Sequence, residues 1–255
     1  GERAPPRPIP KIDNLLHPKS IGIIGVSAKR RNFGRIILEN IIGSGFDGVE
    51  AVTKVSGLFP EQQFMFVDGD CGDLPNVASF TFRDQEKAFL LGYHAAHSVM
   101  LIPGGLGETE ESREMTERMI ARITEAHKSL ATGGDGGPAF LGANCMGVIS
   151  RPGKFDTWFI PAAKMPDYRQ YPRRRTAIVS QSGAFLLNRF SQTPEMSPSY
   201  LISMGNQTDL TLGDMMRHFM DSQEVDVIAV YAEGFKDLDG LQFAEAVREA
   251  IRRDK

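Results

Sequence analysis

The chain has little of several features that would assign it to a class at once. It has two cysteines among 255 residues, Cys71 and Cys145, so no disulfide framework is expected and we predict a reduced, cytoplasmic setting. No apolar run approaches the roughly 20 residues of a membrane helix, and no signal-peptide pattern opens the sequence, so no membrane partner is expected. A net charge of −3 gives no reason to expect a nucleic-acid partner.

The histidines lack a pattern as well. Five are present, and none stands with acidic or cysteine neighbours at the spacing of metal ligands, so no metal site is predicted. Two basic clusters, at residues 29–31 and 173–175, are more simply read as solvated turns than as phosphate contacts. The composition, 41% hydrophobic and 24% charged, is that of an ordinary globular protein long enough for two compact domains.

Short apolar runs alternate with helical patterns along most of the chain. Buried strands are expected at residues 20–26, 63–67, 77–82, 99–102, 139–141, 176–179, 200–203 and 225–230. Helices are expected at residues 33–42, 84–96, 108–130, 183–190, 209–220 and 238–253. Strands that alternate with helices predict the α/β class, here with two Rossmann- or flavodoxin-like domains built on parallel sheets.

The predicted organisation has four parts. Residues 1–14 contain a proline-rich stretch and are expected to form an extended arm, and residues 15–150 the first domain. Residues 151–175 are rich in proline and basic residues and are expected to link the domains. Residues 176–255 hold three βα units, so we expect a truncated second domain with an open sheet edge that favours a homo-oligomer.

Two predicted strands end in small and polar residues. Gly-Ala-Asn-Cys at 142–145 follows the first of them, and Ser-Gln-Ser-Gly at 180–183 follows the second. At such ends an α/β sheet presents free N–H groups and a helix N-terminus to an anion. Because Ser182 lacks the surroundings of a nucleophile elbow and no histidine–acid pair accompanies it, we expect Ser182 and Gly183 to bind phosphate.

Three further residues at strand ends are candidates. Asn144 tolerates unusual backbone angles and suits a ligand amide or phosphate. Cys145 is either a buried, inert packing residue or a reactive thiol, and the inert reading is at least as well supported. Glu233, followed by a glycine, is placed for a ligand or a mobile catalytic group; the alternative is a simple acid at a helix start.

The first predicted strand runs into a loop with glycines and basic residues. Gly25, Ser27 and Gly34 resemble a dinucleotide loop without spelling GxGxxG, and Lys29 adds positive charge beside the start of a helix. This pattern predicts a loop that faces a ligand with several phosphates. The alternative is that the glycines serve only strand–helix packing.

Several of these residues fall in stretches that resemble one known family, the nucleoside-diphosphate-forming acyl-CoA synthetases, which are relatives of the succinyl-CoA synthetase α subunit. The matching stretches, in the family's order, are Leu16–Ser27, Gly142–Ile149, Ile178–Ala184, Ser203–Asp209 and Tyr231–Gly234. The resemblance implies a CoA-binding Rossmann-like domain followed by a flavodoxin-like ligase domain. It also implies chemistry in which an acyl phosphate forms, phosphate passes through a histidine, and coenzyme A takes the acyl group as a thioester.

The resemblance also implies roles for the candidate residues. The CoA-phosphate loop is matched by Gly25, Ser27, Lys29 and Gly34. The turn near the thiol end of CoA is matched by Asn144 and Cys145, with Ala143 where the family has proline. The phosphate-receiving helix start is matched by Ser182 and Gly183, and the catalytic acid that orients the phosphohistidine by Glu233.

Two departures from the family limit these expectations. None of the five histidines has the family's His-Thr-Gly context, and no ATP-grasp portion is present, so turnover by this chain alone is not expected. The implied ligands are coenzyme A and a small carboxylic acid. ATP or ADP would act only through an ATP-grasp domain or partner subunit.

The second departure is internal. Between residues 49 and 96 the sequence instead resembles the basic-membrane-protein group of periplasmic nucleoside-binding lipoproteins. We predict a mosaic or engineered chimera in which one α/β fragment replaces another; the alternative is a divergent natural segment. This segment suggests two alternative functions. One is a nucleoside-binding module with Asp68 and Asp84 as candidate contacts, and the other is a folded scaffold without activity.

Overall fold

The structure of the protein is a computed structural model. It describes residues 6–19, 21, 23, 31–46, 64–67, 77–80, 97–102, 104, 110–236 and 238–255, and for 64–67 and 77–80 the backbone only. The predicted strand at 20–26, apart from residues 21 and 23, and the predicted helix at 84–96 lie outside these residues. Among the described helices, none combines the length and the apolar character that crossing a bilayer requires.

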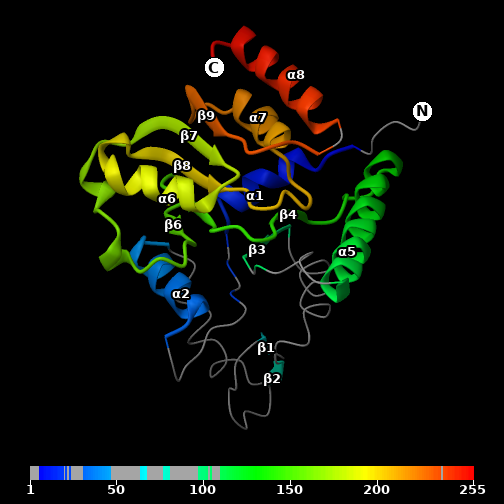
Figure 1. Cartoon of the computed structure of the whole chain (residues 1–255), viewed down its shortest axis with the longest axis horizontal. Coiled ribbons are helices and arrows are strands. Elements are labelled where there is room, and N and C mark those ends of the chain that lie inside the picture. Colours follow the sequence, from blue (N-terminus) through cyan, green and yellow to red (C-terminus); the bar gives the residue numbers. More distant parts are fainter. Residues whose placement is uncertain are drawn as a thin grey trace.

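A five-stranded sheet organises the second half of the chain (Figure 1). Its strands are β5 (Val148–Ser150), β6 (Phe155–Asp156), β7 (Arg174–Ser180), β8 (Pro198–Ser203) and β9 (Val227–Tyr231), in the order β6-β5-β8-β7-β9. β7 pairs in parallel with both β8 and β9, as the alternation of strands and helices predicts. β5 is antiparallel to β6 and β8, so the sheet is mixed, an arrangement that the sequence analysis did not anticipate.

Helices cover both faces of this sheet. α6 (Gly183–Gln192) lies on one face, where its Leu186 and Phe190 pack with Leu201 of β8. α7 (Leu212–Met220) lies on the other face, where it packs with Val179 and Ile202. α8 (Asp239–Arg252) packs on α7 and β9. Because successive side chains of a strand point to opposite faces, two separate apolar clusters form from the same strands.

α7 begins three residues later than predicted, because Thr211 caps it. The Thr211 hydroxyl accepts a hydrogen bond from the Asp214 N–H at 3.2 Å, and the Asp214 carboxylate accepts one from the Thr211 N–H at 3.0 Å. This reciprocal pair is a capping box, which satisfies two N–H groups at the start of a helix.

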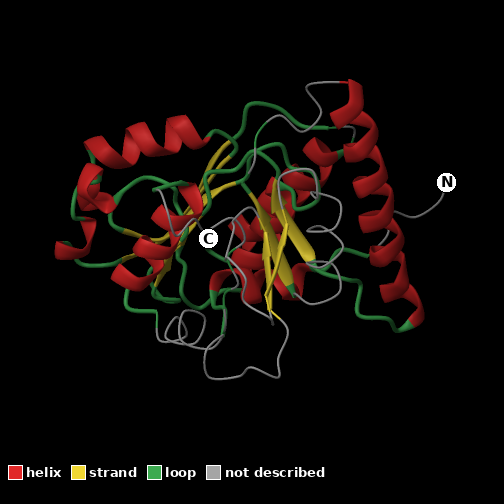
Figure 2. Ribbon diagram, turned by 90° about the horizontal axis from the view of Figure 1, so that it is seen from below, coloured by secondary structure: helices red, strands yellow, loops and turns green. Residues whose placement is uncertain are grey.

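A second, smaller layer precedes this sheet in the chain. β3 (Ser98–Leu101) and β4 (Ala139–Gly142) pair in parallel, and α5 (Glu110–Ser129) packs Met119 and Ile123 against Phe140 of β4. The predicted helix at 108–130 and the predicted strands at 99–102 and 139–141 are confirmed within the described residues. Figure 2 shows α5 at one side of the molecule, apart from the helices that cover the five-stranded sheet.

The first half also contains α2 (Phe33–Gly43), β1 (Phe64–Val67) and β2 (Val77–Phe80). α2 confirms the predicted helix at 33–42. β1 and β2 pair in parallel, within the segment that departs from the synthetase pattern.

The proline-rich N-terminal segment is helical where an extended arm was expected. A 3-10 helix, η1 (Ile9–Lys11), leads into α1 (Ile12–Leu16), so the prediction is wrong for residues 9–14. A proline lies in the first turn of η1, where it costs no hydrogen bond. Ile12 and Leu16 are fully buried in the same cluster as α7. Burial of these apolar side chains thus decides the local structure.

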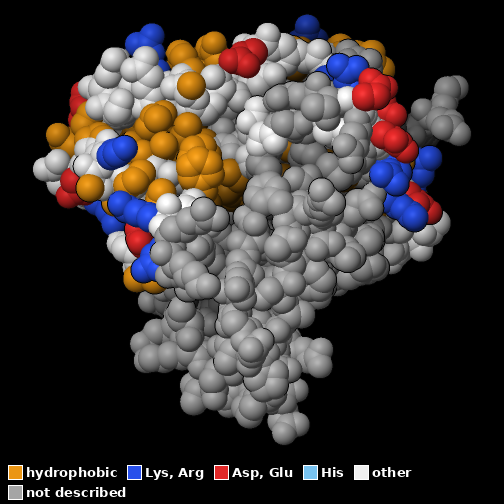
Figure 3. Space-filling view, turned by 60° about the horizontal axis from the view of Figure 1, so that its bottom comes forward, with side chains coloured by type: hydrophobic (Ala, Val, Ile, Leu, Met, Phe, Trp, Pro, Cys, Tyr) orange, Lys and Arg blue, Asp and Glu red, His pale blue; other side chains and the backbone are white. Residues whose placement is uncertain are grey.

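Residues 151–175, expected to be a connection, are packed onto the sheet. The segment contains β6, η4 (Ala162–Lys164) and η5 (Tyr168–Gln170). Trp158 is 1% exposed, and its ring meets that of Phe190 edge-on. Tyr168 also packs on Phe190, at 4.9 Å between ring centroids. The division into domains at 150 and 176 stays a prediction. On the face of the molecule drawn in Figure 3, hydrophobic side chains gather in one region, with charged side chains around it.

Candidate functional site

The carboxyl ends of four strands lead into loops that hydrogen bonds join together. The Asn206 N–H after β8 donates to the carbonyl of Ala143 after β4, at 2.8 Å. The Met204 N–H donates to the carbonyl of Ser180 at the end of β7, also at 2.8 Å. The loop after β9 is bound to Gln181, as described below. Ligands of α/β proteins bind at the carboxyl ends of the strands. The candidate residues lie at these ends, as the sequence analysis predicts.

The turn after β4 presents Asn144 to the outside. Asn144 is exposed and has φ of 53°, a left-handed conformation that asparagine tolerates better than most residues. Gly205 approaches this turn so closely that a Cβ on it would collide with the carbonyl oxygen of Ala143. The side chain of Asn144 lies beside Gly104, because a Cβ there would be 3.3 Å from its Oδ1. The amide therefore stands where the ends of β3 and β4 meet.

Cys145 points in the opposite direction, into the protein. Its side chain is 1% exposed, and its thiol donates to the Leu101 carbonyl at 3.3 Å. Burial raises the pKa of the thiol to about 12, so it stays protonated at neutral pH. The structure favours the inert packing residue over the reactive thiol for this side chain.

The N-terminus of α6 has the form expected of an anion site. Ser182 is the N-cap, and its hydroxyl accepts the Phe185 N–H at 3.3 Å. In the part of the chain that the structure describes, no acceptor is found for the N–H groups of Gly183 and Ala184. Gly183 is also needed for packing, because a Cβ there would lie 3.1 Å from Met146. Ser182 thus caps the helix, and the next N–H groups have no acceptor among the described residues.

Glu233 is exposed on the loop that follows β9. Its N–H donates to Oε1 of Gln181 at 2.9 Å, and the N–H of Gly234 donates to the same oxygen at 3.2 Å. Gln181 directly precedes Ser182, so this contact ties the Glu233 loop to the start of α6. Within the described residues, no group bonds the Glu233 carboxylate, which leaves it free for a partner.

Lys236 makes a contact that sequence reasoning missed. Its Nζ donates to the carbonyl oxygens of Asn206, at 2.8 Å, and Gln207, at 3.5 Å. Gln207 is buried with φ of 50°, and its Oε1 accepts the Leu212 N–H at 2.9 Å. Residues 205–209 match the family pattern, which was a signal that this turn matters, but no pattern pointed to Lys236.

The predicted CoA-phosphate loop is only partly described. Gly25, Ser27 and Lys29 lie outside the described residues. Gly34 is buried in the first turn of α2, whose N-cap Asn32 accepts the Arg35 N–H at 3.0 Å. The role of this loop therefore stays a prediction.

The basic clusters contribute to ion pairs on the surface. Arg31 lies 3.0 Å from the carboxylate of Glu39. Arg173 pairs with Glu224 at 2.6 Å, and Arg175 with Asp226 at 2.7 Å. The last two pairs lie near the amino ends of β7 and β9, the opposite end of the sheet from Ser182. For the described arginines, the structure favours solvated surface residues over phosphate contacts.

Among the described histidines, His127 reaches one of these loops, because its Nε2 lies 3.4 Å from the carboxylate of Asp209 in the turn after β8. No described contact joins a histidine to Ser182 or Glu233. His17 bonds Asp13 and Tyr200, and His97 precedes β3, at the end away from Asn144. His127 is fully buried in α5, and His218 belongs to α7. In the described ranges, no group of three or more His, Cys, Asp or Glu side chains could hold a metal ion.

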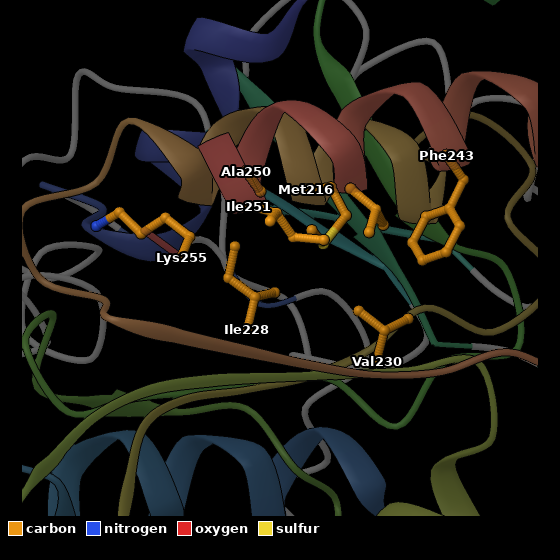
Figure 4. Close-up of a pocket in the computed structure, with 8 residues that line it drawn as sticks. Met216, Ile228, Val230, Phe243, Ala250, Ile251 and Lys255 are labelled. Carbon is orange, nitrogen blue, oxygen red and sulfur yellow. The ribbon is translucent and has the colours of Figure 1, made fainter. Parts of the chain in front are cut away.

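One open pocket lies away from the site. It has a volume of about 340 Å³ between α7, α8 and β9 and is lined by apolar side chains and Lys255 (Figure 4). The lining comprises Met216, Ile228, Val230, Phe243, Val247, Ala250, Ile251 and Lys255. None of the predicted site residues belongs to it.

Fold and loops together define an α/β protein whose candidate site lies in the loops at the carboxyl ends of its strands. Residues 173–255 match the family described as succinyl-CoA ligase like flavodoxin domain. Residues 29–117 match the family described as ABC transporter substrate-binding protein PnrA-like. The second match includes residues 49–96, so both resemblances found in the sequence are confirmed. The mosaic or chimeric origin stays a prediction.

Curated relatives are similar over nearly the whole chain. The α subunits of ADP-forming acetate–CoA ligases I and II of Pyrococcus furiosus are 26% and 27% identical, and each alignment covers 95% of this chain. A 4-hydroxybutyrate–CoA ligase of Nitrosopumilus maritimus is 24% identical over 94% of it. The chain spans about half the length of the first two relatives, 51% and 50%. It is therefore similar to one half of an ADP-forming acyl-CoA ligase α subunit.

Solved structures show the same fold. The dinucleotide-forming acetyl-coenzyme A synthetase 1 of Ca. Korarchaeum cryptofilum, in complex with phosphate and ADP, has a TM-score of 0.69 at 19% identity and covers 94% of this chain and 49% of its own. PH0766 from Pyrococcus horikoshii has a TM-score of 0.67 at 19% identity, over 95% and 52%. The predicted α/β class with Rossmann- and flavodoxin-like parts is confirmed.

Proposed function

We propose that this chain is the CoA-binding portion of an acid–thiol ligase that forms acyl-CoA with a nucleoside triphosphate. One observation carries the proposal: hydrogen bonds join the loops of Asn144, Ser182 and Glu233 at one edge. The similarity to ADP-forming ligase α subunits supports a ligase chemistry for these loops. Coenzyme A supplies the thiol that becomes the thioester.

The residues divide the work by their chemistry. The exposed Asn144 amide is proposed to bind near the thiol end of CoA, and Gly25, Ser27, Lys29 and Gly34 to hold its phosphates. The free N–H groups at the start of α6 favour a phosphate at Ser182 and Gly183, since a helix N-terminus attracts anions. Glu233 is proposed to orient the histidine through which phosphate passes.

A partner is part of the proposal. Because no described contact joins Glu233 to a histidine, the phosphate-carrying histidine is proposed to come from another segment or another subunit. ATP or ADP would act through an ATP-grasp domain or subunit, and two relatives are themselves named as α subunits. The substrate proposed besides CoA is a small carboxylic acid.

Calorimetric titration with coenzyme A tests the proposal. We expect heat of binding, and a rise in unfolding temperature, because a ligand at 100 times its Kd stabilises the native state by about 2.7 kcal/mol. Asn144→Ala should weaken CoA binding roughly tenfold, the loss of about one hydrogen bond. Asn188→Ala, at another exposed asparagine, on α6, is the control.

Two outcomes would count against it. The absence of both binding heat and thermal stabilisation at millimolar CoA would refute CoA binding. Binding of guanosine or adenosine instead would favour a nucleoside-binding module, the function suggested by the match at residues 29–117.

A further inference from the structure

We infer that Gln181 and Lys236 are positioning residues, which hold the loop of Glu233 beside the start of α6. The inference rests on the proposed function, in which Glu233 acts next to a phosphate bound at that helix start. Neither side chain needs to touch the ligand. Each works through the backbone of a neighbouring loop.

Gln181 extends the pairing of β7 and β9 beyond the last residues of the sheet. Its own N–H donates to the carbonyl of Tyr231 at 2.9 Å, as the next bond of the ladder. Its side-chain oxygen then accepts the N–H groups of Glu233 and Gly234, at 2.9 and 3.2 Å. A single amide oxygen thus takes the place of a strand neighbour for two successive residues.

Lys236 fixes the other side of the loop. Its Nζ bonds the Asn206 carbonyl at 2.8 Å, and the Asn206 N–H bonds Ala143 at 2.8 Å. The Lys236 ammonium is therefore held by backbone carbonyls of the neighbouring loop. A chain of contacts runs from the Glu233 loop to the turn that carries Asn144.

The loop needs these contacts because little else holds it. Residues 232–236 are exposed, and a Cβ at Gly234 would meet nothing within 4 Å. Apart from the hydrogen bonds of Gln181 and Lys236, which together form a clamp, the described contacts of this loop are few. The Phe235 ring packs on Phe243, at 5.2 Å between centroids, and the Asp239 N–H donates to the Lys236 carbonyl at 2.8 Å. Fixing several exposed backbone residues is entropically costly, so without the clamp the carboxylate would sample many positions.

Amide hydrogen exchange, followed by NMR on the full 255-residue chain, tests the clamp directly. In Gln181→Met, which keeps the length but loses the acceptor, the amides of Glu233 and Gly234 should exchange at least tenfold faster. Gln181→Glu keeps an acceptor oxygen and should restore protection. Gln192→Met, an exposed glutamine at the end of α6, is the matched control and should change neither amide.

Phosphate affinity distinguishes a positioning role from a merely structural one, because a merely structural role would not change the effect of Glu233 on phosphate binding. With inorganic phosphate as the probe, Glu233→Gln should tighten binding about fivefold, because it removes a negative charge beside the anion. In the Gln181→Met or Lys236→Met background the same change should shift the Kd by less than twofold. A displaced carboxylate no longer acts on the phosphate.

Unchanged exchange at both amides in Gln181→Met would overturn the inference. So would an equal effect of Glu233→Gln with and without Gln181. If no variant binds phosphate and the chain does not bind CoA, the proposed function fails. Because the exchange experiment needs no ligand, it still decides whether Gln181 holds the loop.

Discussion

Replacing Arg7 by methionine should lower the free energy of unfolding more than replacing any exposed arginine does. The Arg7 guanidinium bonds the Asp214 carboxylate at 2.8 Å and lies 2.8 Å from that of Asp209. The two carboxylates are 1% and 0% exposed, whereas Arg7 is 25% exposed. Removing one partner of a buried ion pair costs about 3–5 kcal/mol, and partial exposure of Arg7 places the expected loss at about 3 kcal/mol.

Urea unfolding, followed by fluorescence, measures this loss. The chain has one tryptophan, Trp158, which is 1% exposed and packed on Phe190, so its emission reports the folded core. Arg175→Met is the matched control, because the Arg175–Asp226 pair is exposed and should contribute little. Adding Asp209→Asn to Arg7→Met should recover part of the loss, since one stranded charge is then gone.

A free energy of unfolding for Arg7→Met within 1 kcal/mol of the unaltered chain would refute the reasoning. It would mean that water reaches the two carboxylates once the guanidinium is removed. An equal loss in Arg175→Met would refute it as well, because burial would then not be the cause.

Three further predictions concern buried groups and one tight contact. Burial, and then the charge of Arg7, lower the pKa of His127 to about 4. The stability that neutral His127 contributes is therefore lost as the pH falls from 6.5 towards 4, and in His127→Gln the unfolding temperature should depend less on pH in that range. Burial raises the pKa of Asp156 to about 7, so Asp156→Asn should stabilise the protein above pH 7 by on the order of 2 kcal/mol, as urea unfolding at pH 8 would measure. Gly205→Ala should destabilise by roughly 3 kcal/mol and weaken CoA binding, because the new Cβ meets the Ala143 carbonyl, whereas Gly234→Ala has open space and should unfold normally; equal unfolding midpoints would contradict this.

Periodicity predicted the elements that carry a full apolar face. The helix at 108–130 has methionines and isoleucines at helical spacing, and the structure gives Glu110–Ser129. The run at 139–141 is apolar throughout, and all four residues of Ala139–Gly142 are buried. In such elements the apolar residues of the sequence pattern are the ones that pack in the core, so the pattern alone predicts the element.

Elements that depend on distant packing were not predictable. β5 and β6 have three and two residues, too few to show an alternation, and they exist because β8 offers a free edge. The N-terminal prolines predicted extended chain, but burial of Ile12 and Leu16 against α7 outweighed local preference. Tertiary contacts decide such segments.

The site shows the same division. Asn144, Ser182 and Glu233 stand directly after strands, so the rule for strand ends was enough to find them. Gln181 and Lys236 act on backbone groups 52 and 30 residues away. No spacing rule in a single sequence reveals such pairs, because any residue with the right reach can make them.

The ion pair of Arg7 also constrains the order in which the protein folds. Its partners Asp209 and Asp214 follow it by 202 and 207 residues, and the Ser150 hydroxyl bonds the Leu16 carbonyl across 134 residues. A growing chain cannot complete the Arg7 contacts until residue 214 has left the ribosome, and contacts of such long range form slowly. The segment around Arg7 is therefore made well before it can settle, and until then its apolar residues remain available to other chains.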